Sequence, residues 1–121
     1  MLRTSKYLKG KRAEKKASRF LEKKDYNILY KNWRCSFGEI DIVAKKENIL
    51  CFIEVKSKTS SSFGLPRESV DRFKKDKLIK LAKYFVSKND FYQTTGIRFD
   101  VVEIMGRKIN LIQNAFTETE Q

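Results

Sequence analysis

The hydrophobic and polar positions along the chain divide it into seven predicted elements. Apolar residues recur at helical spacing over about 11–24 and again over about 67–87, which predicts two amphipathic helices. β-Branched and aromatic residues predict five strands, at 26–33, 39–43, 49–56, 98–105 and 108–112. The order α-β-β-β-α-β-β predicts an α/β protein with a mixed β-sheet flanked by helices.

The extent of the core follows from the same pattern. Segment 49–56 (ILCFIEVK) is almost continuously apolar, which is typical of a central strand buried on both faces. The Ser/Thr-rich segment 59–62 predicts a loop. We expect a single domain over 1–121 with its core at about 10–113, and a frayed tail over 114–121.

Charge indicates the kind of partner. The 121 residues include 27 basic and 15 acidic side chains, a net charge of +12. The excess lies in segments 1–34 and 71–88, the regions of the two predicted helices. Such a balance favours a polyanion, and we expect nucleic acid. No apolar run approaches the roughly 18 residues of a membrane span, and no apolar stretch follows the N-terminal charges, so we expect no membrane association and a cytoplasmic location.

The absence of one residue type limits the chemistry. The chain contains no histidine, which excludes Ser-His-Asp and Cys-His catalysis, histidine zinc sites and nucleases with a histidine base. Two cysteines are too few for a structural zinc site. Any reaction must therefore use carboxylates, lysines, hydroxyls or a hard metal ion held by oxygen ligands.

Carboxylates occur inside two of the predicted strands, where an unpaired charge is costly. Side chains alternate along a strand, so Glu39 and Asp41 share one face of segment 39–43, and Ile40 and Ile42 are expected on the other. If this strand forms a hairpin with the next one, Asp41 lies beside a glutamate on the neighbouring strand.

That glutamate is Glu54, and Lys56 follows it on the same face. Two neighbouring carboxylates repel each other, and a divalent cation relieves the repulsion. Hard oxygen ligands favour Mg²⁺ or Mn²⁺, with Lys56 beside a metal-bound water, an arrangement suited to phosphodiester hydrolysis. The alternative is a buried ion pair of Lys56 with Asp41 or Glu54, without metal. The acid-x-Lys pattern alone is weak, because it also occurs at 14–16 and 22–24.

The stretches GEIDIVA at 38–44 and CFIEVKSK at 51–58 resemble the YraN family of endonuclease-like proteins, in the PD-(D/E)XK, restriction-endonuclease-like group. The similarity extends over about 10–104. It implies a restriction-endonuclease-like core, with Asp41, Glu54 and Lys56 as the active-site trio. It also implies that Glu14, on the first helix, is an accessory acid.

Two positions depart from the family pattern. Ala13 stands where glycine is expected, and Ile40 rather than proline precedes the aspartate. A helix accommodates alanine easily, and the acidic residues and the lysine of the trio are all present.

For four further residues the sequence leaves two interpretations. Glu14 borders the apolar face of its helix, so it points either to the sheet or to solvent. Glu39 is expected in an ion pair rather than as a ligand, and Asp100 as a structural partner of Arg98 or of lysines rather than as a catalytic residue. Trp33 could stack on a base, but core packing is the better expectation.

Lysines on the second helix form either a solvated face or a phosphate track, and the one-sided excess favours the track. We expect nucleic-acid contacts from the basic residues of both helices: Lys11, Arg12, Lys74, Lys77 and Lys80.

The leading hypothesis is a metal-dependent nuclease that recognises branched, flapped or single-stranded structure, with DNA as the expected substrate. A nuclease-like fold that binds nucleic acid without cleaving it is the main alternative. A basic RNA-associated protein with structural ion pairs is a third. A homodimer is compatible with the sequence but not indicated by any feature of it.

Overall fold

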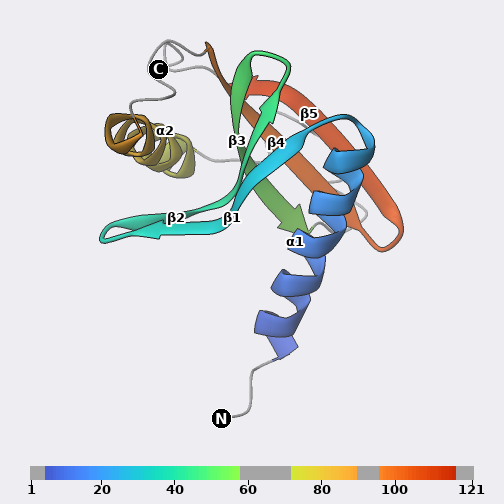
Figure 1. Cartoon of the computed structure of the whole chain (residues 1–121). Helices are drawn as coiled ribbons and strands as arrows, with labels where there is room; N and C mark the ends of the chain where they lie inside the picture. Colours follow the sequence, from blue (N-terminus) through green and yellow to red (C-terminus); the bar gives the residue numbers. More distant parts are fainter. Residues whose placement is uncertain (1–4, 58–71, 90–95, 117–121) are drawn as a thin grey trace.

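Helices cover both faces of one β-sheet (Figure 1). The computed structural model describes residues 5–57, 72–89 and 96–116. Its elements follow the predicted order: α1 (Ser5–Lys23), β1 (Asn27–Cys35), β2 (Gly38–Lys46), β3 (Ile49–Ser57), α2 (Arg72–Lys88), β4 (Gly96–Met105) and β5 (Lys108–Phe116). The predicted fold class is thereby confirmed.

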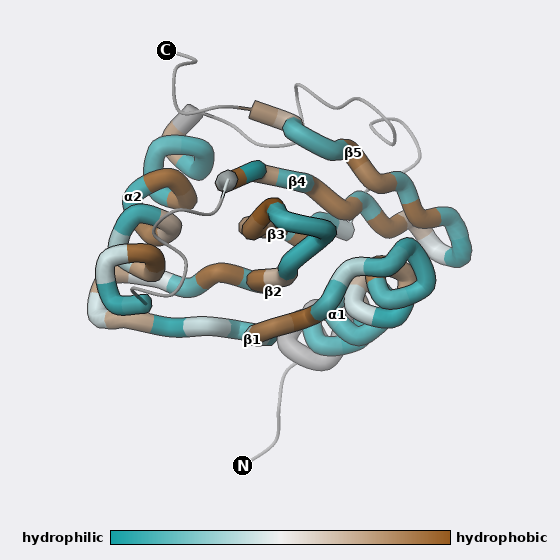
Figure 2. The backbone as a smooth tube through the Cα atoms, turned by 45° about the horizontal axis from the view of Figure 1, so that its top comes forward, coloured by the Kyte–Doolittle hydropathy of each residue, from teal (hydrophilic) through white to brown (hydrophobic). Residues whose placement is uncertain are grey.

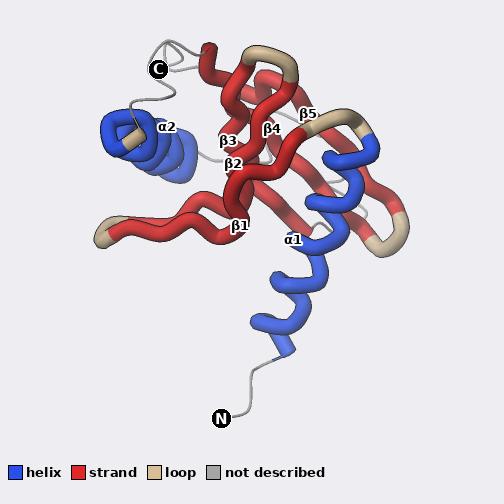
Figure 3. The backbone as a smooth tube through the Cα atoms, in the orientation of Figure 1, coloured by secondary structure: helices blue, strands red, loops and turns tan. Residues whose placement is uncertain are grey.

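The sheet has five strands in the order β1-β2-β3-β4-β5. Three pairs are antiparallel, and β3 pairs with β4 in parallel. Parallel neighbours need a crossover connection, and the chain between β3 and β4 contains α2, whereas the antiparallel neighbours follow one another after short turns (Figure 3). The sheet is therefore mixed, as the sequence predicts.

Two hydrophobic cores lie on opposite sides of the sheet (Figure 2). On β3, Leu50 and Phe52 belong to the core under α2, whereas Cys51 and Ile53 belong to the core under α1. All four side chains are fully buried. The prediction that 49–56 forms a central strand buried on both faces is confirmed over this stretch, and β3 fixes the middle of the molecule.

The boundaries differ from the prediction in places. Helix α1 begins at Ser5, six residues before the expected start at 11. Strand β5 continues to Phe116, so the expected frayed tail from 114 onwards is wrong for its first three residues. Phe116 is buried and stacks on Phe99 with ring centroids 4.9 Å apart, which explains the longer strand. The expected loop at 59–62, the start of the second helix at 67–71 and the tail 117–121 lie outside the described residues.

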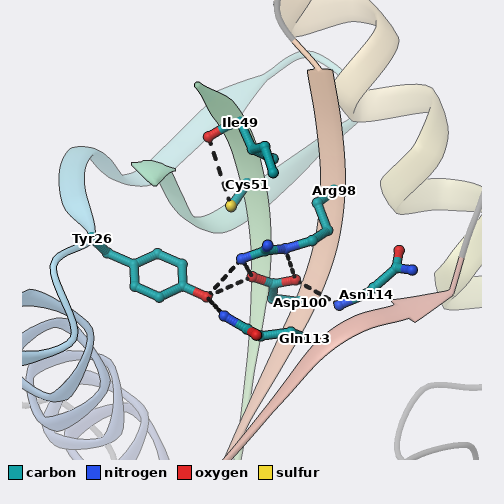
Figure 4. Close-up of polar contacts among 7 residues, drawn as sticks. All are labelled: Tyr26, Ile49, Cys51, Arg98, Asp100, Gln113 and Asn114. Atoms are coloured by element: carbon teal, nitrogen blue, oxygen red, sulfur yellow. Dashed lines mark hydrogen bonds and ion pairs between the residues drawn. The ribbon is translucent and has the colours of Figure 1, made fainter. Parts of the chain in front are cut away.

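A buried polar network joins the start of β1 to β4 and β5 (Figure 4). Asp100 is fully buried and accepts hydrogen bonds from Arg98 Nε at 2.9 Å, from the Tyr26 hydroxyl at 3.0 Å and from the Asn114 backbone N–H at 2.9 Å. Arg98 and Gln113 also donate to the Tyr26 hydroxyl, and burial raises the pKa of Tyr26 to about 12. The expected partnership of Asp100 with Arg98 is confirmed.

We predict that Asp100→Asn lowers the free energy of unfolding by about 2–4 kcal/mol, because it leaves the largely buried Arg98 guanidinium without its countercharge. Urea denaturation followed by circular dichroism measures the loss. The control is Arg34→Gln, which breaks the exposed Arg34–Glu39 pair and should cost less than about 1 kcal/mol. Equal losses in the two variants would contradict a structural role for the buried network.

Candidate metal centre

The candidate site lies where β2 separates from β3. Backbone pairing between the two strands ends at Ile42 and Ile53, and β2 continues beside β1 as far as Gly38. Just beyond the last pair, Asp41 Oδ2 accepts the backbone N–H of Val55 at 2.9 Å. The Asp41 carboxylate thus accepts the first hydrogen bond beyond the β2–β3 pairing. We call this point, where β2 and β3 diverge, the fork.

A bend in the β1–β2 hairpin accompanies this separation. Asn32 lies between Lys31, which pairs with Ile42, and Trp33, which pairs with Ile40, and it has a left-handed backbone conformation with φ of 55°. On the two sides of the bend, Ile40 packs in the core under α2 and Ile42 in the core under α1. The prediction that these isoleucines share a face is therefore wrong, because regular alternation stops at the bend.

Four carboxylates from three elements line one pocket: Glu14 of α1, Glu39 and Asp41 of β2, and Glu54 of β3. Each of the first three offers an oxygen such that these atoms lie within 4.8 Å of one another. The remaining lining residues come from α2, namely Lys74, Lys77, Leu78 and Leu81. Acidic ligand atoms therefore converge beside lysines and an apolar wall.

Two carboxylates of the pocket, Asp41 and Glu54, have raised pKa values. Burial and the nearby charge of Glu54 raise the pKa of Asp41 from 3.8 to about 7, against the opposing hydrogen bond from Val55. Burial also raises the pKa of Glu54, while the charges of Lys56 and Lys74 lower it. Burial and the neighbouring acids therefore oppose full ionisation of Asp41 and Glu54, and a bound cation would favour it.

One carboxylate oxygen of Glu14 is buried without a hydrogen-bond donor among the described residues. Its Oε2 is buried and accepts no hydrogen bond from any residue that the structure describes, and Lys11 Nζ lies 3.9 Å away. An unbonded oxygen among clustered carboxylates fits a hard divalent cation, because such an ion takes oxygen ligands and neutralises their repulsion. The residues that could hold Mg²⁺ or Mn²⁺ are Asp41, Glu14 and Glu39, whose oxygens converge, and Glu54, which lines the same pocket outside that group.

The structure brings most of the predicted site residues together. Asp41, Glu54 and Glu14 line the pocket with Lys74 and Lys77. Helical spacing predicts that Glu14 can face the sheet, and it does. Lys56, on β3, is half-buried and does not line the pocket, although its charge lowers the pKa of Glu54. On the helices, Arg12 and Lys80 are exposed and Lys11 is half-buried.

The role of Glu39 is broader than the expected ion pair. It does pair with Arg34, with Nε and Oε2 3.2 Å apart, but it also belongs to the carboxylate cluster. Its alternation with Asp41 along β2 was the available signal. Trp33 packs against the buried Phe85 with ring centroids 5.2 Å apart, which confirms the expected packing role.

A two-helix α/β core with a mixed five-stranded sheet and acidic residues at the fork between its second and third strands defines a restriction-endonuclease-like protein. Residues 13–104 match the model of the uncharacterised protein family UPF0102, and the chain belongs to this family, the YraN family that the sequence resembles.

Relatives from distant bacteria match over nearly their whole length. The chain is 43% identical to a protein of Sulfurihydrogenibium sp. (strain YO3AOP1), over 90% of this chain and 94% of the relative. It is 41% identical to one of Caldanaerobacter subterraneus subsp. tengcongensis, over 96% and 100%, and 46% identical to one of Clostridioides difficile (strain 630), over 89% and 96%. All three are named UPF0102 proteins, a name that states no activity.

No described helix of this chain is long and apolar enough to cross a membrane.

Stability should depend on pH through Asp41. Its folded-state pKa of about 7 exceeds its ordinary value of 3.8, so the folded protein holds a proton that the unfolded chain has lost, and stability falls as pH rises through this window. We predict that Asp41→Asn removes about 1–3 kcal/mol of this fall between pH 4 and pH 8, measured by urea denaturation in EDTA.

Magnesium should raise the stability of the wild type at pH 8 more than that of the asparagine variant, because the variant lacks one of the four carboxylates that could bind the ion. Glu22→Gln, at an exposed position of α1, is the matched control and should behave as the wild type. Parallel pH profiles for wild type and Asp41→Asn would contradict the prediction.

The left-handed backbone at Asn32 gives a separate test of the bend. Asn32→Ala should lower the free energy of unfolding by about 1–2 kcal/mol and weaken Mn²⁺ binding, whereas Asn32→Gly should preserve the affinity. Urea denaturation and Mn²⁺ titration measure the two effects. If glycine weakens the binding as much as alanine does, the side-chain amide of Asn32 matters and its backbone conformation does not.

Proposed function

We propose that this protein is a metal-dependent nuclease that hydrolyses phosphodiester bonds in nucleic acid, with structured or single-stranded DNA as its expected substrate. The observation that carries the proposal is the cluster of four carboxylates at the fork, one of which has a buried oxygen without a hydrogen bond. A structural ion-pair site would have its acids matched by donors, as Asp100 is.

In this proposal Asp41 and Glu54 hold Mg²⁺ or Mn²⁺, and Glu14 completes the ligand set from α1. When bound, the metal polarises the phosphate and lowers the pKa of a water molecule. Asp41 stays oriented by the Val55 N–H, so its other oxygen remains available as a ligand. Lys56 positions the attacking water or stabilises the charge that develops on the phosphate.

The lysines of α2 supply the substrate contacts. Lys74 and Lys77 line the same pocket as the carboxylates, so a phosphate at the site lies next to cations from another element. Lys80 continues this basic surface along α2, and Lys11 and Arg12 add charge from α1. Contacts to the backbone phosphates carry no sequence information, which is consistent with selection by structure.

A homodimer and a cytoplasmic location remain predictions.

Nuclease activity is tested by incubating the protein with Mg²⁺ or Mn²⁺ and labelled duplex, single-stranded, flapped and four-way-junction DNA, alongside single-stranded and duplex RNA. We predict that Glu54→Gln reduces cleavage at least about 100-fold, because the loss of a ligand charge removes the metal from its productive position. EDTA should abolish cleavage by the wild type.

Two controls separate the site from a contaminant and from misfolding. Glu22→Gln removes an exposed acid of α1 and should cleave as the wild type does. Glu54→Gln should keep its salt-dependent binding to nucleic acid, because that binding depends on the lysines. Tight binding without cleavage in the wild type under either metal would overturn the nuclease and favour the non-catalytic binding module.

A further inference from the structure

Two aromatic side chains near the carboxylate pocket are open to solvent. Phe37, in the turn that joins β1 to β2, is 43% exposed, and Phe73, in the first turn of α2, is 75% exposed. Single exposed apolar residues are ordinary on protein surfaces, so exposure alone indicates nothing. These two are distinguished by their nearness along the chain to pocket-lining residues, since Phe37 is two residues before Glu39 and Phe73 directly precedes Lys74.

Phe37 lies at the pocket margin. It is two residues before Glu39, so their Cα atoms are about 7 Å apart along the strand. The intervening Gly38 packs so closely on α2 that an added Cβ would stand 3.0 Å from Lys77 Cε and 3.2 Å from Leu81. Both contacts are pocket-lining residues, so the hairpin turn and the pocket share one wall.

The ring of Phe37 is held in place by α2. It meets Tyr84 in an edge-on contact, with ring centroids 5.3 Å apart, and Lys88 Nζ lies 5.4 Å from the centroid of the Tyr84 ring. The far end of the β1–β2 hairpin extends away from the rest of the sheet and lies alongside α2 (Figure 3). Phe37 is therefore a fixed aromatic surface with a cation nearby.

Phe73 begins a ridge on α2 that contains two aromatic and three basic residues. The ridge has the spacing i, i+4, i+7, i+11 and i+15, which places its members on one side of the helix: Phe73, Lys77, Lys80, Tyr84 and Lys88. It spans about 22 Å at 1.5 Å per residue, enough for several nucleotides. Within α2 the sole acidic residue is Asp76, which lies off this ridge.

We propose that this ridge and Phe37 bind a single-stranded polynucleotide, with unpaired bases stacked on Phe37 and Phe73 and phosphates beside Lys77 and Lys80. Aromatic platforms along a basic groove bind single strands, because every base has a face to stack while the cations follow the backbone. The inference rests on the proposed nuclease function and deepens it: the substrate class is nucleic acid with unpaired nucleotides at the site.

Charge selects this occupant over an apolar protein partner. A hydrophobic interface is depleted in lysine at its centre, whereas here lysines stand between the aromatic rings. A base-paired duplex offers no free base face in its interior, so it would use the cations and leave the aromatic rings unused.

Binding in EDTA tests the inference without requiring cleavage. Fluorescence anisotropy with a labelled 12-nucleotide single strand and with a duplex of the same length gives the two affinities. Phe37→Ala and Phe73→Ala should each weaken single-strand binding about 5- to 100-fold while changing duplex binding less than about 2-fold. Phe37→Trp should retain single-strand affinity.

Tyr30→Ala is the matched control. Tyr30, on β1, is an aromatic residue with the same 43% exposure as Phe37. Its ring packs on Phe85, and neither residue lines the pocket, so its loss should not affect single strands selectively. Circular dichroism of every variant verifies folding. Lys77→Ala should weaken both ligands and reduce the salt slope by about one unit.

Stacking itself is read from 2-aminopurine placed in the single strand, whose fluorescence should fall on binding to the wild type and fall less with Phe37→Ala. Unchanged single-strand affinity in both phenylalanine variants, or equal weakening of single strand and duplex, overturns the inference. Selective losses in a protein that never cleaves would refute the nuclease and leave the single-strand site standing.

Discussion

The hydrogen bond from the Val55 backbone N–H to Asp41 marks the point on which the site depends. A regular β2–β3 ladder would continue past Ile42 and pair backbone groups here; instead a side chain satisfies the donor, and the strands separate. The gap exposes the flank of β3 that carries Glu54. It also frees β2 to follow β1 outward, so the hairpin reaches α2. At this point a side-chain carboxylate takes the place of a backbone acceptor. The pocket opens there, and the hairpin reaches α2, which forms the second wall of the pocket.

Close packing then fixes what surrounds the acids. Gly38 has no side chain, and α2 approaches it closely enough that a Cβ would crowd Lys77 and Leu81. This approach brings Lys77 into the pocket, and Lys74, one turn earlier on the helix, lines it as well. The opposite wall is α1, whose apolar face packs Ala17 and Leu21 on the sheet and so turns Glu14 inward. The packing of the apolar helix faces therefore places charged side chains in the pocket, although burial by itself disfavours charge.

The sequence predicts the element order, the central strand and the meeting of Asp41 with Glu54, because alternation on strands and a short hairpin turn are local properties. Glu14 follows from helical periodicity in the same way. The bend at Asp41 could not be predicted, since it depends on a left-handed Asn32 in the neighbouring strand and on where β3 ends its pairing. For the same reason regular alternation wrongly predicts one face for the isoleucines at 40 and 42. The place of Glu39 in the cluster is different, because its alternation with Asp41 does indicate that the two side chains can meet. The metal and the polynucleotide stay predictions.

Two buried aspartates show why residue type alone does not separate structure from function. Asp100 is fully buried, yet Arg98, Tyr26 and a backbone N–H supply its oxygens with donors. Among the described residues, Asp41 accepts a hydrogen bond from the Val55 N–H and has acidic neighbours, and its pKa is raised to about 7. Both stand in apolar strands, so their sequence contexts are alike. The difference is the number of hydrogen-bond donors around each carboxylate. Where donors satisfy the carboxylate oxygens, the acid joins strands together. Where donors are too few, the acid keeps oxygens that can bind a cation.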